Sequence, residues 1–128
     1  MLPPRRSGKM KGGVWTKEQV EGVIKRQFPR HRKWVRGFSC SIQGCPNSSP
    51  IEAAHVTLPL PKGKGHLKGG TGQKWHDAMC ISLCHDHHMI QHAEGWVSFE
   101  KSMGRDAVEL AFEFASKSPV QEIRDAVK

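Results

Sequence analysis

The chain has 128 residues, which fits one domain, and because only 37% are hydrophobic and 7% aromatic, its core is thin enough for a bound metal to help stabilise it. Lys and Arg outnumber Asp and Glu by 20 to 12, and this excess favours a polyanionic partner, nucleic acid ahead of an acidic membrane. No stretch approaches the roughly 18 apolar residues that span a bilayer, and the charged N-terminus lacks the apolar region of a secretory signal, so we expect a cytoplasmic protein without a membrane partner.

The N-terminal part of the chain is predicted to contain a basic arm and one helix. Residues 1–13 are basic and rich in Pro and Gly, so we expect a flexible arm, followed by a single domain over residues 14–128. Thr16 and Gln19 have the spacing of a capping box, which predicts a helix through about Phe28 that Pro29 ends.

Two short strands and a helix are predicted in the middle of the chain. The strands are residues 51–58 and 78–83, and a long loop rich in Gly, Pro and Lys joins them. A loop of this length in a compact domain is usually functional or disordered. The second strand leads through Cys84 into a helix to about Ala93, which Gly95 ends.

The C-terminal region is predicted to be helical. Asp106 precedes an amphipathic run over residues 107–117, and Ser118, Pro119 and Gln121 are typical of the start of a short last helix. Helices before and after a strand pair predict an α+β domain, with its C-terminal helices at about residues 106–127.

Cysteine and histidine residues are spaced like the ligands of a structural zinc ion. Cys40 and Cys45 flank a turn that contains glycine, and Cys84 and His87 form a second short pair. Two such pairs from separate segments match the tetrahedral thiolate and imidazole coordination of structural zinc. The alternative is four unrelated buried side chains, and the density of ligands favours zinc. Cys80, the remaining cysteine, is expected to pack as a small hydrophobic residue.

The helix after Cys84 carries further histidines. His88 and His92 are spaced i, i+4, so they stack on one helix face and can chelate a second metal ion, with an exposed polar face as the alternative. His55 lies on the first predicted strand, and a two-stranded ribbon packed on the helix would bring it opposite this pair. A neutral imidazole there can take a proton from water while a divalent ion stabilises the charge of a phosphate, which is the chemistry of phosphodiester hydrolysis.

Three segments together resemble the HNH endonuclease superfamily, which has the ββα-metal fold. They are "AAHV", "GTGQKWHD" and "ISLCHDHHMIQH", in this order, and the resemblance covers about residues 34–96. Within the superfamily the chain looks most like small phage and prophage proteins, some of which act in DNA recombination in a bacterial host cell. The resemblance implies a small ββα-metal core, similar to a treble clef, with a structural zinc ion and flanking helices.

The resemblance also implies a role for individual residues. His55 would be the general base, and His88 and His92 would bind the catalytic ion, Mg²⁺ or another divalent metal. The four zinc ligands would brace the core, as in many HNH modules.

Two positions depart from the pattern of the superfamily. Ala54 stands before the base, where a metal ligand is common, and Met79 stands at the position of the Asn in the superfamily's name. Asp77 is the expected substitute, either as a metal ligand or as the group that orients His55, and capping of the loop is its alternative role.

The sequence therefore predicts a metal-dependent DNA endonuclease, with two rival functions. Arg36, Lys68 and Lys74 are expected to contact phosphates, although ordinary surface charge also explains them. The first rival is a non-catalytic zinc-stabilised module that binds nucleic acid, which Ala54 and Met79 favour. The second is an interaction protein whose last two helices dock a partner such as a recombinase filament, although core packing explains their amphipathic pattern equally well.

Overall fold

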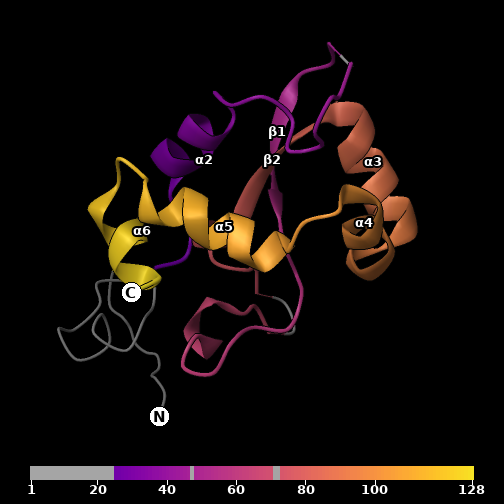
Figure 1. The fold of residues 1–128 in the computed structure, drawn as a ribbon. Coiled ribbons are helices and arrows are strands. Elements are labelled where there is room, and N and C mark those ends of the chain that lie inside the picture. Colours follow the sequence, from indigo (N-terminus) through magenta and orange to yellow (C-terminus); the bar gives the residue numbers. More distant parts are fainter. Residues whose placement is uncertain (1–24, 47, 71–72) are drawn as a thin grey trace, which may run out of the picture.

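The computed structural model describes residues 25–46, 48–70 and 73–128. The predicted arm at residues 1–13 and the predicted capping box lie outside these residues. The described chain is a mixed α and β structure, with a two-stranded sheet and helices before and after it (Figure 1). Its elements, in chain order, are helix α2 (Pro29–Val35), strand β1 (Ile51–His55), the 3-10 helices η2 (Gly65–Leu67) and η3 (Asp77–Met79), strand β2 (Cys80–Cys84), and helices α3 (His85–Glu94), α4 (Trp96–Met103), α5 (Ala107–Ser116) and α6 (Gln121–Ala126).

Strands β1 and β2 form an antiparallel ribbon in which Glu52 lies opposite Leu83 and His55 lies opposite Cys80. Both strands lie where the sequence predicted them, although β1 ends three residues earlier than expected and β2 begins two residues later. Side chains alternate between the faces of a strand, so Glu52 and Ala54 leave one face of the ribbon and His55 leaves the other.

Helices lie on both sides of the ribbon. α3 packs against it on the side of Glu52, and α4 packs against α3. α2 also packs against both strands and lies across the ribbon from α3 in Figure 1, where α5 crosses in front. The side chains that fill the core between these layers are fully buried and include Val35, Leu67, Met79, Ile81, Leu83 and Ile123.

The prediction of a helix that Pro29 ends is wrong in the described part. Residues 25–28 are not helical, and Pro29 begins α2 instead. Proline suits the first position of a helix because the N–H at that position has no partner within the helix, and because the ring already holds φ near its helical value. The sequence analysis used this proline only as a stop signal.

Gly95 ends α3 as predicted, but it also begins α4, which the sequence analysis missed. Its φ of 83° lies in the region that glycine adopts without steric cost, and its N–H donates to the carbonyl of Gln91 at 2.8 Å. One residue therefore turns the chain from one helix into the next. No loop separates the two helices, so the usual signal for a second helix is missing.

The two C-terminal helices were predicted correctly. The carboxylate of Asp106 caps α5 by accepting a hydrogen bond from the amide of Glu109 at 3.0 Å. The buried residues of α5 include Leu110 and Ala111, and this helix packs against β2 and η3. Core packing therefore accounts for the amphipathic pattern of α5.

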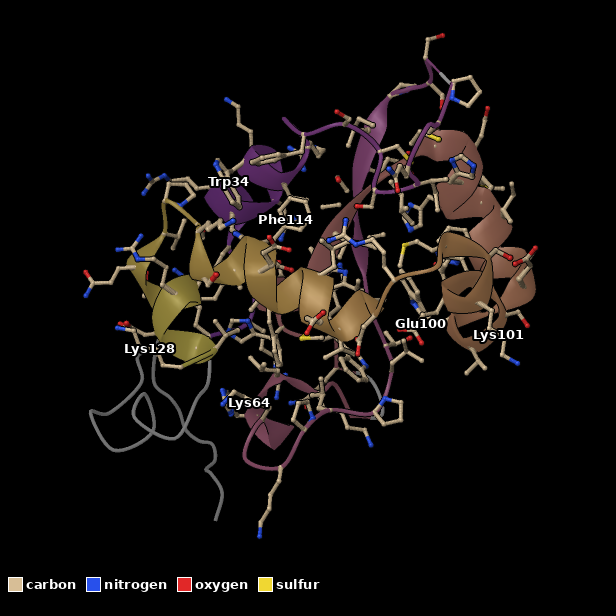
Figure 2. All side chains as sticks on the ribbon, viewed as in Figure 1. Trp34, Lys64, Glu100, Lys101, Phe114 and Lys128 are labelled. Atoms are coloured by element: carbon tan, nitrogen blue, oxygen red, sulfur yellow. The ribbon has the colours of Figure 1, made fainter. Side chains whose placement is uncertain are left out.

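The described part of the long loop between the strands folds onto the C-terminal end of the chain. Leu67 of η2 is fully buried, and its carbonyl accepts a hydrogen bond from the amide of His76 at 3.0 Å. The Nζ atom of Lys64 donates to the carbonyl of Lys128 at 3.0 Å (Figure 2). These contacts tie the loop to the segments that follow it.

Candidate functional site

Cys40, Cys45, Cys84 and His87 form one group, which we call the Cys/His cluster, as the sequence predicted. Nδ1 of His87 lies 3.4 Å from Sγ of Cys40, 3.4 Å from Sγ of Cys45 and 3.2 Å from Sγ of Cys84. The Sγ atoms of Cys45 and Cys84 are 3.9 Å apart. In a tetrahedral zinc site, sulfur and nitrogen ligands are about 3.6 Å apart and two sulfurs about 3.8 Å apart. The cluster therefore has the dimensions of a site for one metal ion.

A tight turn and the start of a helix position the Cys/His cluster. Gly44 has a φ of 74°, and the amide of Cys45 donates to the carbonyl three residues earlier at 3.1 Å. Cys84 is the N-cap of α3, and its Sγ accepts a hydrogen bond from the amide of His87 at 3.4 Å. Partial burial raises the pKa of the Cys40 thiol, and a bound cation would favour the thiolate.

His55 and Asp77 form a hydrogen-bonded pair, with Nε2 of the imidazole 2.8 Å from Oδ1 of the carboxylate. Asp77 is almost fully buried, and its Oδ2 accepts hydrogen bonds from the amide of Phe28 at 2.6 Å and from the guanidinium of Arg32. Burial alone would raise the pKa of Asp77, but the hydrogen bonds from His55 and Phe28 and the charge of Arg32 hold this pKa below its ordinary value. Asp77 is therefore an anion at neutral pH.

The charge on Asp77 fixes the protonation pattern of His55. An ionised carboxylate only accepts hydrogen bonds, so Nε2 of a neutral His55 carries the proton. Nδ1 then has a free lone pair, and within the described residues no hydrogen bond involves this atom. The side chain of His55 is 29% exposed, which lets water approach. Of the roles predicted for Asp77, orientation of His55 has this direct contact in its favour.

Cys80 is fully buried beside this pair. Its Sγ and ligand atoms of His55 and Asp77 all lie within 4.8 Å of one another. Burial raises the pKa of the Cys80 thiol. Cys80 lies outside the Cys/His cluster and is buried, as the sequence predicted.

His88 and His92 form a second histidine group together with Glu52, which we call the His/Glu cluster. The two Nε2 atoms lie 3.2 Å apart, and two imidazole nitrogens bound to one ion are about 3.0–3.4 Å apart. Nδ1 of His88 donates to Oε1 of Glu52 at 2.7 Å, and Nδ1 of His85 donates to Oε2 at 2.9 Å. Hydrogen bonds from His88 and His85 lower the pKa of Glu52. The carboxylate thus orients His88 in the way that metal-binding histidines are commonly oriented.

Helix α3 runs alongside β1, and two contacts fix their relative position. Near the start of both elements His88 bonds to Glu52, and just after α3 the indole Nε1 of Trp96 donates to the carbonyl of His55 at 3.0 Å. His92 lies one helical turn after His88 on the same face of α3.

The position of the His55 imidazole differs from the sequence-based expectation, which placed it opposite His88 and His92. Glu52 and His55 are three residues apart, so their side chains leave opposite faces of the ribbon. Among the described residues, no hydrogen bond or ligand group joins the His55 imidazole to His88 or His92. The backbone of His55 nevertheless reaches α4 through Trp96.

The two residues that depart from the HNH pattern both lie in the core. Ala54 and Met79 have no exposed surface. Neither side chain carries an atom that binds a hard metal ion, so neither adds a ligand to the His/Glu cluster.

Sequence reasoning missed two residues of the site, Arg32 and Glu52. Each acts on a partner that is distant in sequence, Arg32 on Asp77 and Glu52 on His88. An acidic residue on a half-buried strand was the only signal for Glu52. No spacing rule links either residue to its partner.

The three basic residues predicted to contact phosphates are all exposed: Arg36, Lys68 and Lys74. Arg36 follows α2 directly, and the carbonyl of Lys68 accepts a hydrogen bond from the guanidinium of Arg26 at 3.0 Å. Their exposure permits phosphate contacts, and ordinary surface charge would look the same.

Comparisons with known proteins give one partial match. No family model and no solved structure matches the chain. The uncharacterized protein YdfU of Escherichia coli (strain K12) is 32% identical over 89 residues, which are 70% of this chain and 22% of that protein. The chain thus spans less than a quarter of the length of this relative. None of the helices in the described residues is long and apolar enough to cross a membrane.

Proposed function

We propose that the protein is a metal-dependent DNA endonuclease of the HNH type, with the ribbon and α3 as its ββα-metal core. The observation that carries the proposal is the contact of His55 with the buried, ionised Asp77, which leaves Nδ1 of the partly exposed imidazole as the proton acceptor. A buried carboxylate that orients an imidazole in this way is typical of general-base catalysis. The net charge of +8 supports a polyanionic substrate.

The proposed reaction is hydrolysis of a phosphodiester bond. Nδ1 of His55 takes a proton from a water molecule, and the oxygen of that water attacks phosphorus. The bond from phosphorus to the leaving oxygen breaks, and that oxygen takes a proton from solvent. Asp77 stabilises the positive charge that forms on His55, because its hydrogen bond from Nε2 becomes a charged pair.

His88 and His92 would hold the catalytic ion of this enzyme, with Glu52 behind His88. Their Nε2 atoms have the separation of two ligands of one ion. A divalent ion there would stabilise the charge on the phosphate and the leaving oxygen. Because the His55 imidazole leaves the opposite face of the ribbon, the proposal requires the phosphate to reach both groups around the end of β1. Because Ala54 adds no ligand, water and the substrate would complete the coordination of the ion.

The Cys/His cluster would bind zinc as a structural ion. Three thiolates and one imidazole make a closed tetrahedral site without a position for substrate, which is the pattern of structural zinc. This ion would link the 40–45 turn to the start of α3 and so hold the catalytic helix against the ribbon.

The proposal is tested by nicking of supercoiled plasmid and of single-stranded DNA by the zinc-loaded protein, with Mg²⁺, Mn²⁺ or Ni²⁺ added in turn. The wild type should cut, and His55→Ala with equal zinc content should not. His66→Ala is the matched control, because His66 is an exposed histidine outside the described clusters. Equal cutting by the wild type and His55→Ala would contradict His55 as the base.

A zinc-stabilised module that binds nucleic acid without cutting it is the second candidate. The burial of Ala54 and Met79 favours it, since two positions that serve the HNH reaction are here part of the core. Under this alternative the wild type and His55→Ala both bind DNA with a steep salt dependence, and neither cuts with any of the three ions.

A further inference from the structure

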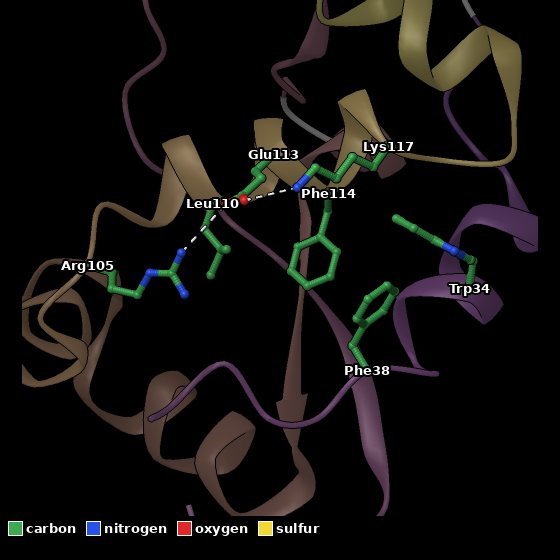
Figure 3. Close-up of a pocket in the computed structure, with 7 residues that line it drawn as sticks. All are labelled: Trp34, Phe38, Arg105, Leu110, Glu113, Phe114 and Lys117. Atoms are coloured by element: carbon green, nitrogen blue, oxygen red, sulfur yellow. Dashed lines mark hydrogen bonds and ion pairs between the residues drawn. The ribbon is translucent and has the colours of Figure 1, made fainter. Parts of the chain in front are cut away.

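An apolar groove lies between α2 and α5 (Figure 3). Its lining includes no residue of the Cys/His cluster, the His/Glu cluster or the His55–Asp77 pair. Its volume is about 220 Å³, and its apolar lining is Trp34, Phe38, Leu110 and Phe114. We call it the aromatic groove. The ring of Phe38 meets those of Trp34 and Phe114 edge to face, with centroids 4.9 and 5.2 Å apart. Phe38 is 43% exposed, so part of its ring is open to a ligand.

Basic side chains outnumber acidic ones in the lining of the aromatic groove, where Arg105 and Lys117 flank Glu113. Arg105 and Lys117 stand at its rim, where they lie 3.6 and 3.4 Å from the two carboxylate oxygens of Glu113 (Figure 3). Lys33 and Arg36, which are close in sequence to Trp34 and Phe38, are exposed but do not line the groove. Helix α2 carries no acidic residue in its first turn. A basic or neutral apolar partner would leave these cations unpaired, whereas a polyanionic partner would pair with them.

The groove continues into a second, more polar hollow. This hollow has a volume of about 300 Å³ and shares Phe38, Arg105, Leu110 and Phe114 with the aromatic groove. Its other side is lined by Ser39, Ser41 and Gln43, at the turn that carries the Cys/His cluster. The surface thus offers stacking faces at one end and hydrogen-bonding groups at the other, and Arg105 lines both.

We propose that the aromatic groove binds single-stranded nucleic acid, with a base against the exposed ring of Phe38 and the sugar-phosphate chain running toward Ser39–Gln43. Proteins that bind single strands combine aromatic platforms for bases with cationic surfaces for phosphates. A duplex keeps its bases stacked on each other, so it cannot use the rings. The proposal takes the polyanionic partner from the proposed function but does not require cleavage.

The test measures binding of a labelled single strand of about 15 nucleotides to the zinc-loaded full chain without added Mg²⁺. Fluorescence anisotropy should give a Kd that Phe38→Ala raises about 5- to 100-fold, in line with the loss of one stacked base. Ile90→Ala is the matched control, since Ile90 is also 43% exposed, and it should leave the Kd within about twofold of the wild type. Binding of a duplex should change no more than about twofold in Phe38→Ala.

Two further measurements keep the test decisive. Phe38→Leu keeps an apolar side chain without a ring, so it replaces Phe38→Ala if that variant does not fold. A bound base should also quench the fluorescence of Trp34, and Trp34→Phe should lose that quenching. A wild type that does not bind single strands, a ring removal without effect, or an equal loss on single strands and duplex overturns the proposal. A wild type that binds through Phe38 but never cuts overturns the proposed endonuclease alone.

Discussion

His88 and Glu52 join α3 to β1 through a hydrogen bond of 2.7 Å from Nδ1 to Oε1. This bond uses Nδ1 of His88, so Nε2 is the nitrogen left to bind a metal ion, and it is hydrogen-bonded to Nε2 of His92 at 3.2 Å. Carboxylates that orient metal-binding histidines typically change metal affinity about 10- to 100-fold. We therefore expect Glu52→Ala to weaken Ni²⁺ binding to the zinc-loaded protein by about 10- to 100-fold, measured by calorimetry.

The control for this prediction separates orientation from charge. Glu52→Gln keeps an oxygen that accepts the hydrogen bond from His88, so it should weaken Ni²⁺ binding less than Glu52→Ala does. His85→Ala removes only the partner of the second carboxylate oxygen and should stay close to the wild type. If Glu52→Ala binds Ni²⁺ as tightly as the wild type does, Glu52 does not orient a metal ligand.

Asp77→Asn should reduce DNA cleavage much more than DNA binding. The amide that replaces the carboxylate has no negative charge, so it no longer stabilises a protonated His55 and can present its NH₂ group to Nε2. We expect the cleavage rate to fall by about 10²- to 10⁴-fold, the range seen when an orienting carboxylate is removed from a catalytic histidine.

Stability must be measured beside the cleavage rate in this variant, because Asp77 is buried and paired with Arg32. Arg32→Met removes the charge partner but retains the carboxylate beside His55, so a folded Arg32→Met should keep most of the activity. An Asp77→Asn protein that folds and cuts at the wild-type rate would contradict the role of Asp77.

Removal of metal should unfold much of the protein. The Cys/His cluster joins segments that are far apart in sequence, and structural zinc binding contributes on the order of 10 kcal/mol to small domains. Cys45→Ser should lower zinc content and Tm together, measured by atomic absorption and circular dichroism. Cys80→Ala is the control, since it should lose some core packing but retain one zinc ion per chain. Equal zinc content in Cys45→Ser and the wild type would exclude Cys45 as a ligand.

The sequence was sufficient to predict the Cys/His cluster because its ligands come in two short pairs. The relative position of two residues that are close in sequence depends on the local backbone. The turn at Gly44 and the N-cap at Cys84 set that local backbone for the two pairs. The ends of α3 and α5 were predictable for the same reason, since Gly95 and Asp106 act on the helices they adjoin.

The contacts between distant segments could not be predicted from the sequence. Asp77 was identified as an orienting group, but Arg32 and Glu52 were not, because no periodicity connects a charge with a partner in another element. The face of the ribbon taken by His55 depends on the register of β1 and β2, and one residue of register reverses it. The aromatic groove likewise depends on how α5 lies against α2.

A fall in pH should destabilise the protein at pH values well above those at which carboxylates become protonated. His31 is fully buried, and burial lowers its pKa to about 4 from an ordinary value of 6.5. The unfolded chain therefore binds a proton at His31 as pH falls below 6.5, while the folded chain does so only near 4. Folding stability is then lost between pH 6.5 and 4, by up to about 3 kcal/mol for a shift of this size. Burial lowers the pKa of His76 to about 4 as well, so both histidines act in one window.

Urea unfolding of the wild type, His31→Leu and Ser118→Ala at pH 7 and pH 5 tests this prediction. His31→Leu removes the group that titrates, so its stability should fall less between the two pH values than that of the wild type. Ser118→Ala removes the hydroxyl that lies 2.9 Å from Nδ1 of His31 but leaves the imidazole in place. It should be less stable at both pH values and keep the steep dependence on pH, and zinc loss in acid should affect all three proteins alike. Equal pH dependence in His31→Leu and the wild type would show that His31 does not resist protonation in the folded chain.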